Sequence, residues 1–143
     1  MPMLYRIDHE ARVVVAAGHG VLTDADVFGY QREVWSRPEV KGYAELVDMT
    51  HVTEIALPSP ERIKVLAALA ADMDQDASSS RFAILAPSDI AFGLGRMFQA
   101  YRESHSKSTK EVGVFRTMEE VLAFLRIRTP LEMPADPTSV DRG

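Results

Sequence analysis

The chain of 143 residues contains no cysteine and a single tryptophan. The lack of cysteine excludes disulfide bonds, thiolate zinc sites and cysteine nucleophiles. Long hydrophobic runs are also missing: the longest, residues 13–18 and 65–71, fall far short of the roughly 20 apolar residues that cross a bilayer. The first residues lack the basic start and apolar stretch of a secretory signal. The sequence therefore predicts a cytoplasmic protein with no membrane span.

Basic charge is scarce as well. Lysine and arginine number 16 against 21 acidic residues, which gives a formal net charge of −5. Nucleic-acid binding and docking on anionic lipid both need a clustered basic surface, so neither is expected. Of the residues in the chain, 46% are hydrophobic and 26% are charged, a composition typical of one globular domain with a core.

Hydrophobic patterns predict strands alternating with helices. Strands are expected over residues 4–8, 12–17, 44–49, 81–86 and 112–115, and helices over residues 23–36, 59–73, 88–104 and 117–125. Gly18-His19-Gly20 is expected to end the second strand, and residues 50–58 to form a loop. The helix starts are marked by Thr23 with Asp26, Ser59 before Pro60, Ser88, and Thr117 with Glu120.

This order predicts an α/β fold. The expected architecture is a mixed five-stranded sheet with an antiparallel N-terminal edge hairpin, then a βαβαβα pattern with helices on both faces. The domain is expected to span residues 1–127. Residues 128–143 place three prolines among small and polar residues and are expected to form a disordered tail. The carboxyl ends of the parallel strands should share one rim, where open α/β sheets usually bind ligands.

The predicted first helix has two apolar sides. Phe28 and Trp35 lie on one, and nearly opposite lie Val27, Tyr30 and Val34. One side should face the sheet, and the other must be covered by the domain itself or by a partner. Val27, Tyr30 and Val34 are therefore candidates for an interface with another protein or with a second copy of the chain.

Polar candidates for a site lie at the predicted rim. Asp48, Thr50 and His51 follow the third strand, where His51 with Asp48 suits a polar ligand contact or acid–base chemistry. Asp48 suits equally well a turn in which it accepts backbone N–H groups. Ser88 and Arg116 open the third and fourth helices, whose N-termini attract anions, or they serve in capping alone.

The stretch from Phe92 to Arg96 is unusual for a helix. Phe92 lies off the apolar stripe, and Gly93 and Gly95 each cost about 1 kcal/mol relative to alanine. Either close packing on a neighbouring element or a ligand or partner site at Phe92 and Arg96 explains the two glycines.

No catalytic or metal-binding motif is recognisable. The four histidines lie on separate segments without ligand spacing, and G-x-S-x-G, H-E-x-x-H and P-loop patterns are missing. Gly18-His19-Gly20 with Thr23 lacks the third glycine of a dinucleotide-binding turn. The sequence predicts no catalytic residue, no metal and no cofactor.

Four segments, in this order, resemble the SpoIIAA-like superfamily, which includes STAS domains and relatives of CRAL-TRIO lipid-transfer domains. They are residues 18–23 (GHGVLT), 45–52 (ELVDMTHV), 81–86 with 92–98 (RFAILA, FGLGRMF) and 114–125 (VFRTMEEVLAFL). Together they cover roughly residues 4 to 126, and the stand-alone bacterial proteins of the superfamily look most similar. The resemblance implies a cytoplasmic binding module without a cofactor.

STAS proteins bind a kinase-like partner and are switched by phosphorylation of a serine that opens the helix after the third strand. That position falls on Leu57 or Pro58 in this sequence. Ser59 is offset from it, and we assign the Ser59 hydroxyl to helix capping. The resemblance therefore implies partner binding, while the serine of the phosphorylation switch is missing.

Three hypotheses of function follow. The leading one is a non-enzymatic regulatory module that acts through protein–protein contact, including a homodimer. The alternative is a binding protein for a small apolar or amphipathic ligand, in a pocket at the strand C-terminal rim walled by Phe92, Met97 and residues 50–57. A weak enzyme using His51 and Asp48 is the third.

Overall fold

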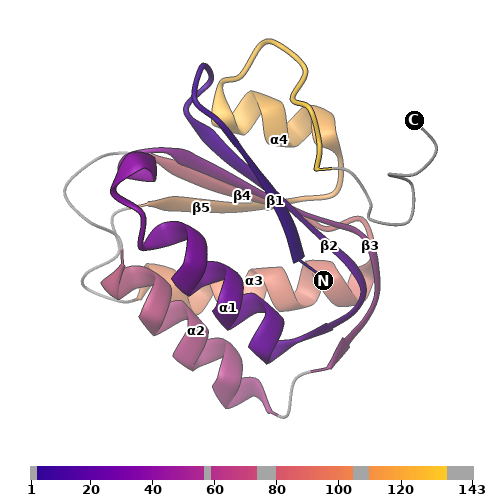
Figure 1. Ribbon diagram of the computed structural model, residues 1–143. Helices are drawn as coiled ribbons and strands as arrows, with labels where there is room; N and C mark the ends of the chain where they lie inside the picture. The colour runs from indigo at the N-terminus through magenta and orange to yellow at the C-terminus, as the bar shows by residue number, and fades with distance from the viewer. Residues whose placement is uncertain (1–2, 57–58, 74–79, 105–109, 135–143) are drawn as a thin grey trace, which may run out of the picture.

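The computed structural model describes residues 3–56, 59–73, 80–104 and 110–134 (Figure 1). Five strands form one sheet in the order β1-β2-β3-β4-β5. The strands are β1 (Met3–Asp8), β2 (Val13–Thr23), β3 (Ala44–Ala56), β4 (Arg81–Leu85) and β5 (Glu111–Phe115). Only β1 and β2 pair antiparallel, and the other neighbours are parallel, which confirms the predicted mixed sheet with its edge hairpin.

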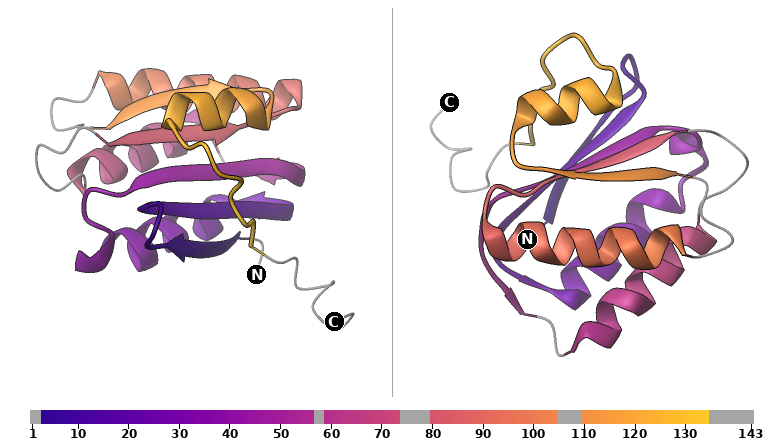
Figure 2. Two further views of the ribbon diagram at one scale, coloured as in Figure 1. Left: turned by 90° about the horizontal axis from the view of Figure 1, so that it is seen from above. Right: turned by 180° about the vertical axis from the view of Figure 1, so that it is seen from behind.

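The helices cover both faces of the sheet, as predicted. α1 (Asp24–Trp35), α2 (Pro60–Asp72) and α3 (Asp89–Glu103) lie on one side, and α4 (Met118–Leu125) lies on the other (Figures 1 and 2). A short 3-10 helix, η1 (Pro38–Val40), follows α1. α2 packs chiefly against α3 and also contacts α1, so it forms the outer part of the three-helix side.

Three of the four predicted helix caps are present. Thr23 and Asp26 form a complete capping box at α1, and the Ser88 hydroxyl accepts from the Ala91 N–H at α3. Thr117 accepts from the Glu120 N–H at α4. The assignment of the Ser59 hydroxyl to capping is wrong, because Ser59 occupies the N-cap position of α2 without a side-chain capping bond. Pro60, whose fixed φ suits the first helical position, begins α2 there.

β2 and β3 run further than the sequence pattern indicates. Gly18-His19-Gly20 does not end β2, and β3 continues through residues 50–56, where a loop was expected. The register between these strands shifts twice along this stretch, as at β-bulges. A Cβ on Gly18 would lie 2.8 Å from Val52 Cγ2, and Gly20 has a φ of +66°. The glycines therefore let a bent strand continue instead of breaking it.

The orientation of α1 corrects the predicted interface. Tyr30 and Val34 are buried in the core cluster against the sheet, and Val27 packs partly buried against it. Phe28, on another side of α1, lies under the guanidinium of Arg62 from α2. The prediction of an exposed patch at Val27, Tyr30 and Val34 is therefore wrong, because the chain's own sheet covers that side.

The chain after α4 also differs from expectation. Residues 128–134, predicted to belong to a disordered tail, cross the sheet face on the α4 side toward β1 (Figure 2). Ile127, Leu131 and Met133 pack partly buried against the core of that face, and Glu132 forms an ion pair of 3.1 Å with Arg6 of β1. The packed part of the chain thus extends to residue 134. The rest of the predicted tail, residues 135–143, lies outside the described residues.

Candidate functional site

A cavity of about 120 Å³ lies between the sheet and helices α1, α2 and α3. Its walls are mainly apolar. The strands contribute Leu22, Val47, Met49, Ile55 and Ile84 among others, and the helices contribute Val27, Ile63, Leu66, Leu94 and Phe98 among others. The charged or amide side chains in the wall are Asp24, Gln31, Glu45 and Arg62.

The cavity differs in position from the predicted rim pocket. It lies between the helices and the sheet, and of residues 50–56, the described part of the expected 50–57 wall, Ile55 alone lines it. Phe92 and Met97 do not line it, because α3 turns Ala91, Leu94 and Phe98 toward the cavity instead.

α2 is fastened to α1 at both ends, and both helices line the cavity. The Arg62 Nε–H donates to Asp24 Oδ2 at 2.8 Å near the start of α2. The Gln31 amide approaches Met73 Sδ at 3.7 Å at the end of α2. Arg62 also stacks 4.5 Å above the Phe28 ring. Three of these fastening residues, Asp24, Gln31 and Arg62, are themselves part of the cavity wall.

Glu45 brings a charge into this apolar surrounding. Its side chain is only 4% exposed, and an unpaired carboxylate at such a place would be costly. The Tyr30 hydroxyl donates to Glu45 Oε2 at 2.8 Å, and the Trp35 indole N–H donates to the same oxygen at 3.1 Å. Glu45 Oε1 pairs with Lys110 Nζ at 3.5 Å. The carboxylate is thus held by three groups from separate parts of the chain.

Lys110 joins the cluster from the segment just before β5. Its side chain is 7% exposed, and its Nζ lies 3.3 Å from the centroid of the Trp35 ring, a cation–π contact. Burial, and next the charge of Glu45, raise the pKa of the Tyr30 hydroxyl well above its ordinary value of 10.0. Tyr30 therefore stays protonated and donates to Glu45 across the neutral pH range.

Asp48, Thr50 and His51 do not line the cavity. Asp48 is buried in the middle of β3, and its Oδ1 accepts from the Thr50 backbone N–H at 2.9 Å and from the Thr50 hydroxyl. His51 is exposed and stacks on His19 of the neighbouring strand, with ring centroids 5.5 Å apart. The side chain of Asp48 is thus used in a local contact within β3, and His51 has an imidazole as its ring neighbour.

The candidates on α3 and before α4 gather at the carboxyl ends of β4 and β5. Arg116 Nη1 donates to Asp89 Oδ1 at 2.7 Å and to the Pro87 carbonyl at 3.1 Å. The Arg116 guanidinium also lies 4.3 Å above the Phe92 ring. Ser88 caps α3 beside them. The positive charge of Arg116, which would attract an anion, is balanced by Asp89. Arg96 is exposed and stands apart from the cavity.

Close packing explains one of the two α3 glycines. A Cβ on Gly95 would lie 2.9 Å from Val114 Cγ1, so Gly95 allows α3 to pack closely on β5. A Cβ on Gly93 would meet nothing within 4 Å, and nothing in the structure explains a glycine there.

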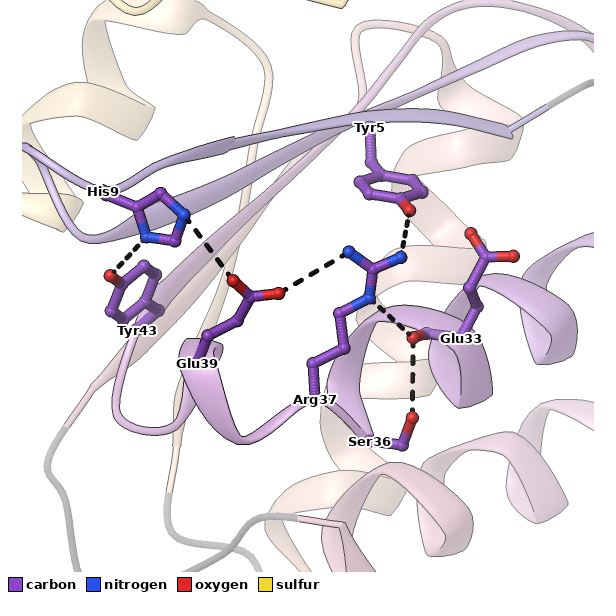
Figure 3. A network of polar contacts seen from close by, with 7 residues as sticks. All are labelled: Tyr5, His9, Glu33, Ser36, Arg37, Glu39 and Tyr43. Atoms are coloured by element: carbon purple, nitrogen blue, oxygen red, sulfur yellow. Dashed lines mark hydrogen bonds and ion pairs between the residues drawn. The ribbon is translucent and has the colours of Figure 1, made fainter.

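A second polar network fastens the end of α1 to the edge of the sheet (Figure 3). Arg37 donates to the Tyr5 hydroxyl of β1 at 2.7 Å and to the Glu33 carbonyl of α1 at 3.3 Å. Glu39 lies 3.7 Å from Arg37 and 3.9 Å from His9, and the ring of His9 bonds to the Tyr43 hydroxyl at 2.8 Å. The side chains of the two ion pairs, Arg37, Glu39 and His9, are more than a third exposed, so these ion pairs contribute little free energy and serve mainly to position the end of α1.

Sequence reasoning missed the Glu45 cluster. The one signal was a charged residue inside a strand of otherwise buried character, and Glu45 was used above only as part of the superfamily resemblance. Tyr30, Trp35 and Lys110 come from distant positions in the chain, and nothing in the sequence pairs them with Glu45.

Within the described ranges, no group of three or more histidine, aspartate or glutamate side chains is arranged to hold a metal ion. No helix in the described part of the chain is long and apolar enough to cross a bilayer. No protein-family model matches the sequence, and no curated protein is similar to it.

Solved structures do resemble the chain. An uncharacterised protein of the DUF3478 family from Shewanella loihica PV-4, described as having a SpoIIAA-like fold, superposes with a TM-score of 0.54. The likeness covers 86% of this chain and 93% of the other at 16% identity. The chain has a SpoIIAA-like fold. At this level of identity, the SpoIIAA-like comparison establishes the architecture alone, and function has to be argued from the site.

Proposed function

We propose that the protein is a non-enzymatic binding protein for a small apolar or amphipathic ligand, held in the cavity between the sheet and helices α1, α2 and α3. The cavity itself carries the proposal. Protein interiors are close-packed, so a cavity of about 120 Å³ with a mainly apolar wall and few charged groups has the lining of a site for a small apolar ligand.

The volume limits the size of the ligand. Engineered apolar cavities of about 150 Å³ stay dry and take up benzene or xenon. The cavity of 120 Å³ therefore suits an aromatic ring or a short branched chain when the helices keep their present positions.

Two contacts support the non-enzymatic part of the proposal. Asp48 Oδ1 is occupied by Thr50, and His51 stacks on His19 instead of approaching Asp48. The pair that would serve an acid–base mechanism is therefore not assembled.

Native mass spectrometry of the protein purified from its own cells tests this proposal. A retained small molecule, released on unfolding and with a mass suited to one ring or a short chain, is expected. Protein that carries no small molecule, and that binds neither benzene nor toluene when these are added, would contradict it.

One observation supports the leading sequence-based hypothesis, that the protein acts through protein–protein contact. Ile90, at the start of α3, is 73% exposed, more than the other exposed large hydrophobic side chains of the described residues. Phe92 lies two residues further on and packs only partly buried. These two side chains suit a small contact patch for a second copy of the chain.

The same mass spectra separate the two candidates. A homodimer whose population falls in Ile90→Glu but not in Val65→Glu, where the exposed side chain lies on α2, supports self-association through the start of α3. A protein that is monomeric at every concentration would contradict it.

A further inference from the structure

Glu45 has unused hydrogen-bonding capacity in the cavity wall. An ionised carboxylate offers about four lone-pair positions. Tyr30 and Trp35 occupy two on Oε2, and Lys110 occupies one on Oε1. One acceptor position on Oε1 therefore remains, on a residue that lines the cavity.

Stability alone does not account for this cluster. Replacing a buried ion pair by apolar residues of similar size is often neutral or stabilising, so a buried carboxylate is weak evidence of a structural role. The three donors instead fix the carboxylate in one orientation. A fixed acceptor loses little freedom when a ligand binds, which is what a recognition group requires.

We propose that the ligand of this cavity carries a neutral hydrogen-bond donor, such as a phenolic or alcoholic hydroxyl, on its apolar body, and that Glu45 Oε1 accepts that hydrogen bond. This inference rests on the proposed function and adds the chemical class of the ligand. The apolar walls hold the body, and Glu45 selects the polar group.

The carboxylates in the cavity wall disfavour ligands that carry a negative charge. A ligand carboxylate at the same place would face the Glu45 carboxylate, whose neighbouring cation Lys110 is already paired with it. Asp24 adds a second carboxylate to the wall, and its partner Arg62 is likewise engaged. Small carboxylic acids should therefore bind more weakly than neutral alcohols or phenols of equal size.

Phenol, toluene and benzoate form a matched set of probes at neutral pH. Phenol and toluene differ by a hydroxyl against a methyl group, and benzoate adds a charge. The single tryptophan gives one indole N–H signal in a ¹H–¹⁵N NMR spectrum, and that N–H donates to Glu45. Dissociation constants are measured by titration, with the Trp35 signal and the methyl signals of the cavity wall as readouts.

We expect phenol to bind about tenfold more tightly than toluene, a difference of about 1.4 kcal/mol. A buried hydroxyl without an acceptor would make phenol the weaker ligand, so the sign of the difference is diagnostic. Phenol should shift the Trp35 signal more than toluene does, and benzoate should bind at least about tenfold more weakly than phenol.

The outcomes separate this inference from the proposed function. Toluene binding that equals or exceeds phenol binding, or benzoate binding tighter than phenol, overturns the donor requirement and leaves the cavity as a binding site. Failure of both toluene and phenol to bind overturns both proposals.

Glu45→Gln tests the residue itself. A neutral amide oxygen is the weaker acceptor, so the preference for phenol should fall toward parity. Glu54→Gln, an exposed position on the same strand, should leave the preference unchanged. An unchanged preference in folded Glu45→Gln contradicts the assignment. If Glu45→Gln does not fold, the comparison of the three probes in the unmodified protein decides alone.

Discussion

Glu45 lies on a strand whose neighbouring positions 44, 46 and 47 are apolar, and its burial has to be offset locally. An unpaired buried ion carries a penalty of several kcal/mol, so each of its donors matters. The Tyr30 hydroxyl is the shortest of these contacts, at 2.8 Å.

Tyr30→Phe removes that donor while keeping the ring. We expect a loss of about 1–3 kcal/mol in the free energy of unfolding, because the buried carboxylate loses a hydrogen bond. Tyr5→Phe is the matched control: its hydroxyl also bonds to a side chain, Arg37, but at the edge of the sheet, and its loss should be under about 1 kcal/mol. Urea unfolding measures both, and equal losses would contradict the importance of the Glu45 cluster.

Alkaline pH gives a second test of Tyr30. The folded-state pKa of Tyr30 lies well above 10.0, the ordinary value that holds in the unfolded chain. Below pH 10 the hydroxyl is protonated in both states, and its contribution is fully present. Above pH 10 the unfolded chain loses the proton first, so this contribution falls by up to about 1.4 kcal/mol per pH unit until the folded pKa is reached.

Tyr30→Phe lacks this dependence. The stability difference between the unmodified protein and Tyr30→Phe should therefore be constant from about pH 8 to about pH 9 and shrink above about pH 10. Urea unfolding across this range measures it. A difference that stays constant or grows above pH 10 would contradict the raised pKa of Tyr30.

At the scale of elements, α3 holds a matched pair of glycines. Gly95→Ala should destabilise the protein by about 1–3 kcal/mol, because the new Cβ would force α3 away from Val114. Gly93→Ala should stabilise it by about 0.5–1 kcal/mol, because the position is open and alanine favours the helix. Thermal and urea unfolding of the two variants check the signs, and two changes of the same sign would disprove this packing of α3.

The segment after α4 yields another prediction. Leu131 packs against the sheet core on the α4 side, so Leu131→Ala should cost about 1–2 kcal/mol, less than a fully buried leucine would. Thr129→Ala, at a neighbouring exposed position, should change stability by less than about 0.5 kcal/mol. If both variants are as stable as the unmodified protein, residues 128–134 do not hold the position described above.

The sequence was sufficient for the elements whose signals are local. The order of strands and helices, the edge hairpin and the caps at Thr23, Ser88 and Thr117 followed from hydrophobic periodicity and side-chain chemistry. The sequence analysis was wrong about features that depend on tertiary contacts. The extension of β2 past Gly18 depends on pairing with Val52, and the choice of which α1 side faces the sheet depends on α2 covering Phe28.

For the whole molecule, the cavity results from layering. α1 and α3 pack on the sheet, and α2 packs against both helices (Figure 2). The cavity between these helices and the sheet is lined by residues of several strands, β3 and β4 among them. No local pattern reports such a volume, since it depends on how far separate elements approach one another. That is why the pocket predicted at the rim, with Phe92 and Met97 in its wall, differs from the cavity that the structure contains.

The central claim is that this cavity is a binding site, and thermal unfolding with benzene tests it most directly. Val47→Phe places a ring in the cavity wall, and Val21→Phe makes the same change at an exposed position of the neighbouring strand. At ten times the dissociation constant, benzene should stabilise the unmodified protein and Val21→Phe by about 1.4 kcal/mol and raise their unfolding midpoints by a few degrees. Val47→Phe should show no rise. An unmodified protein without a rise, or a rise of equal size in Val47→Phe, would contradict the claim.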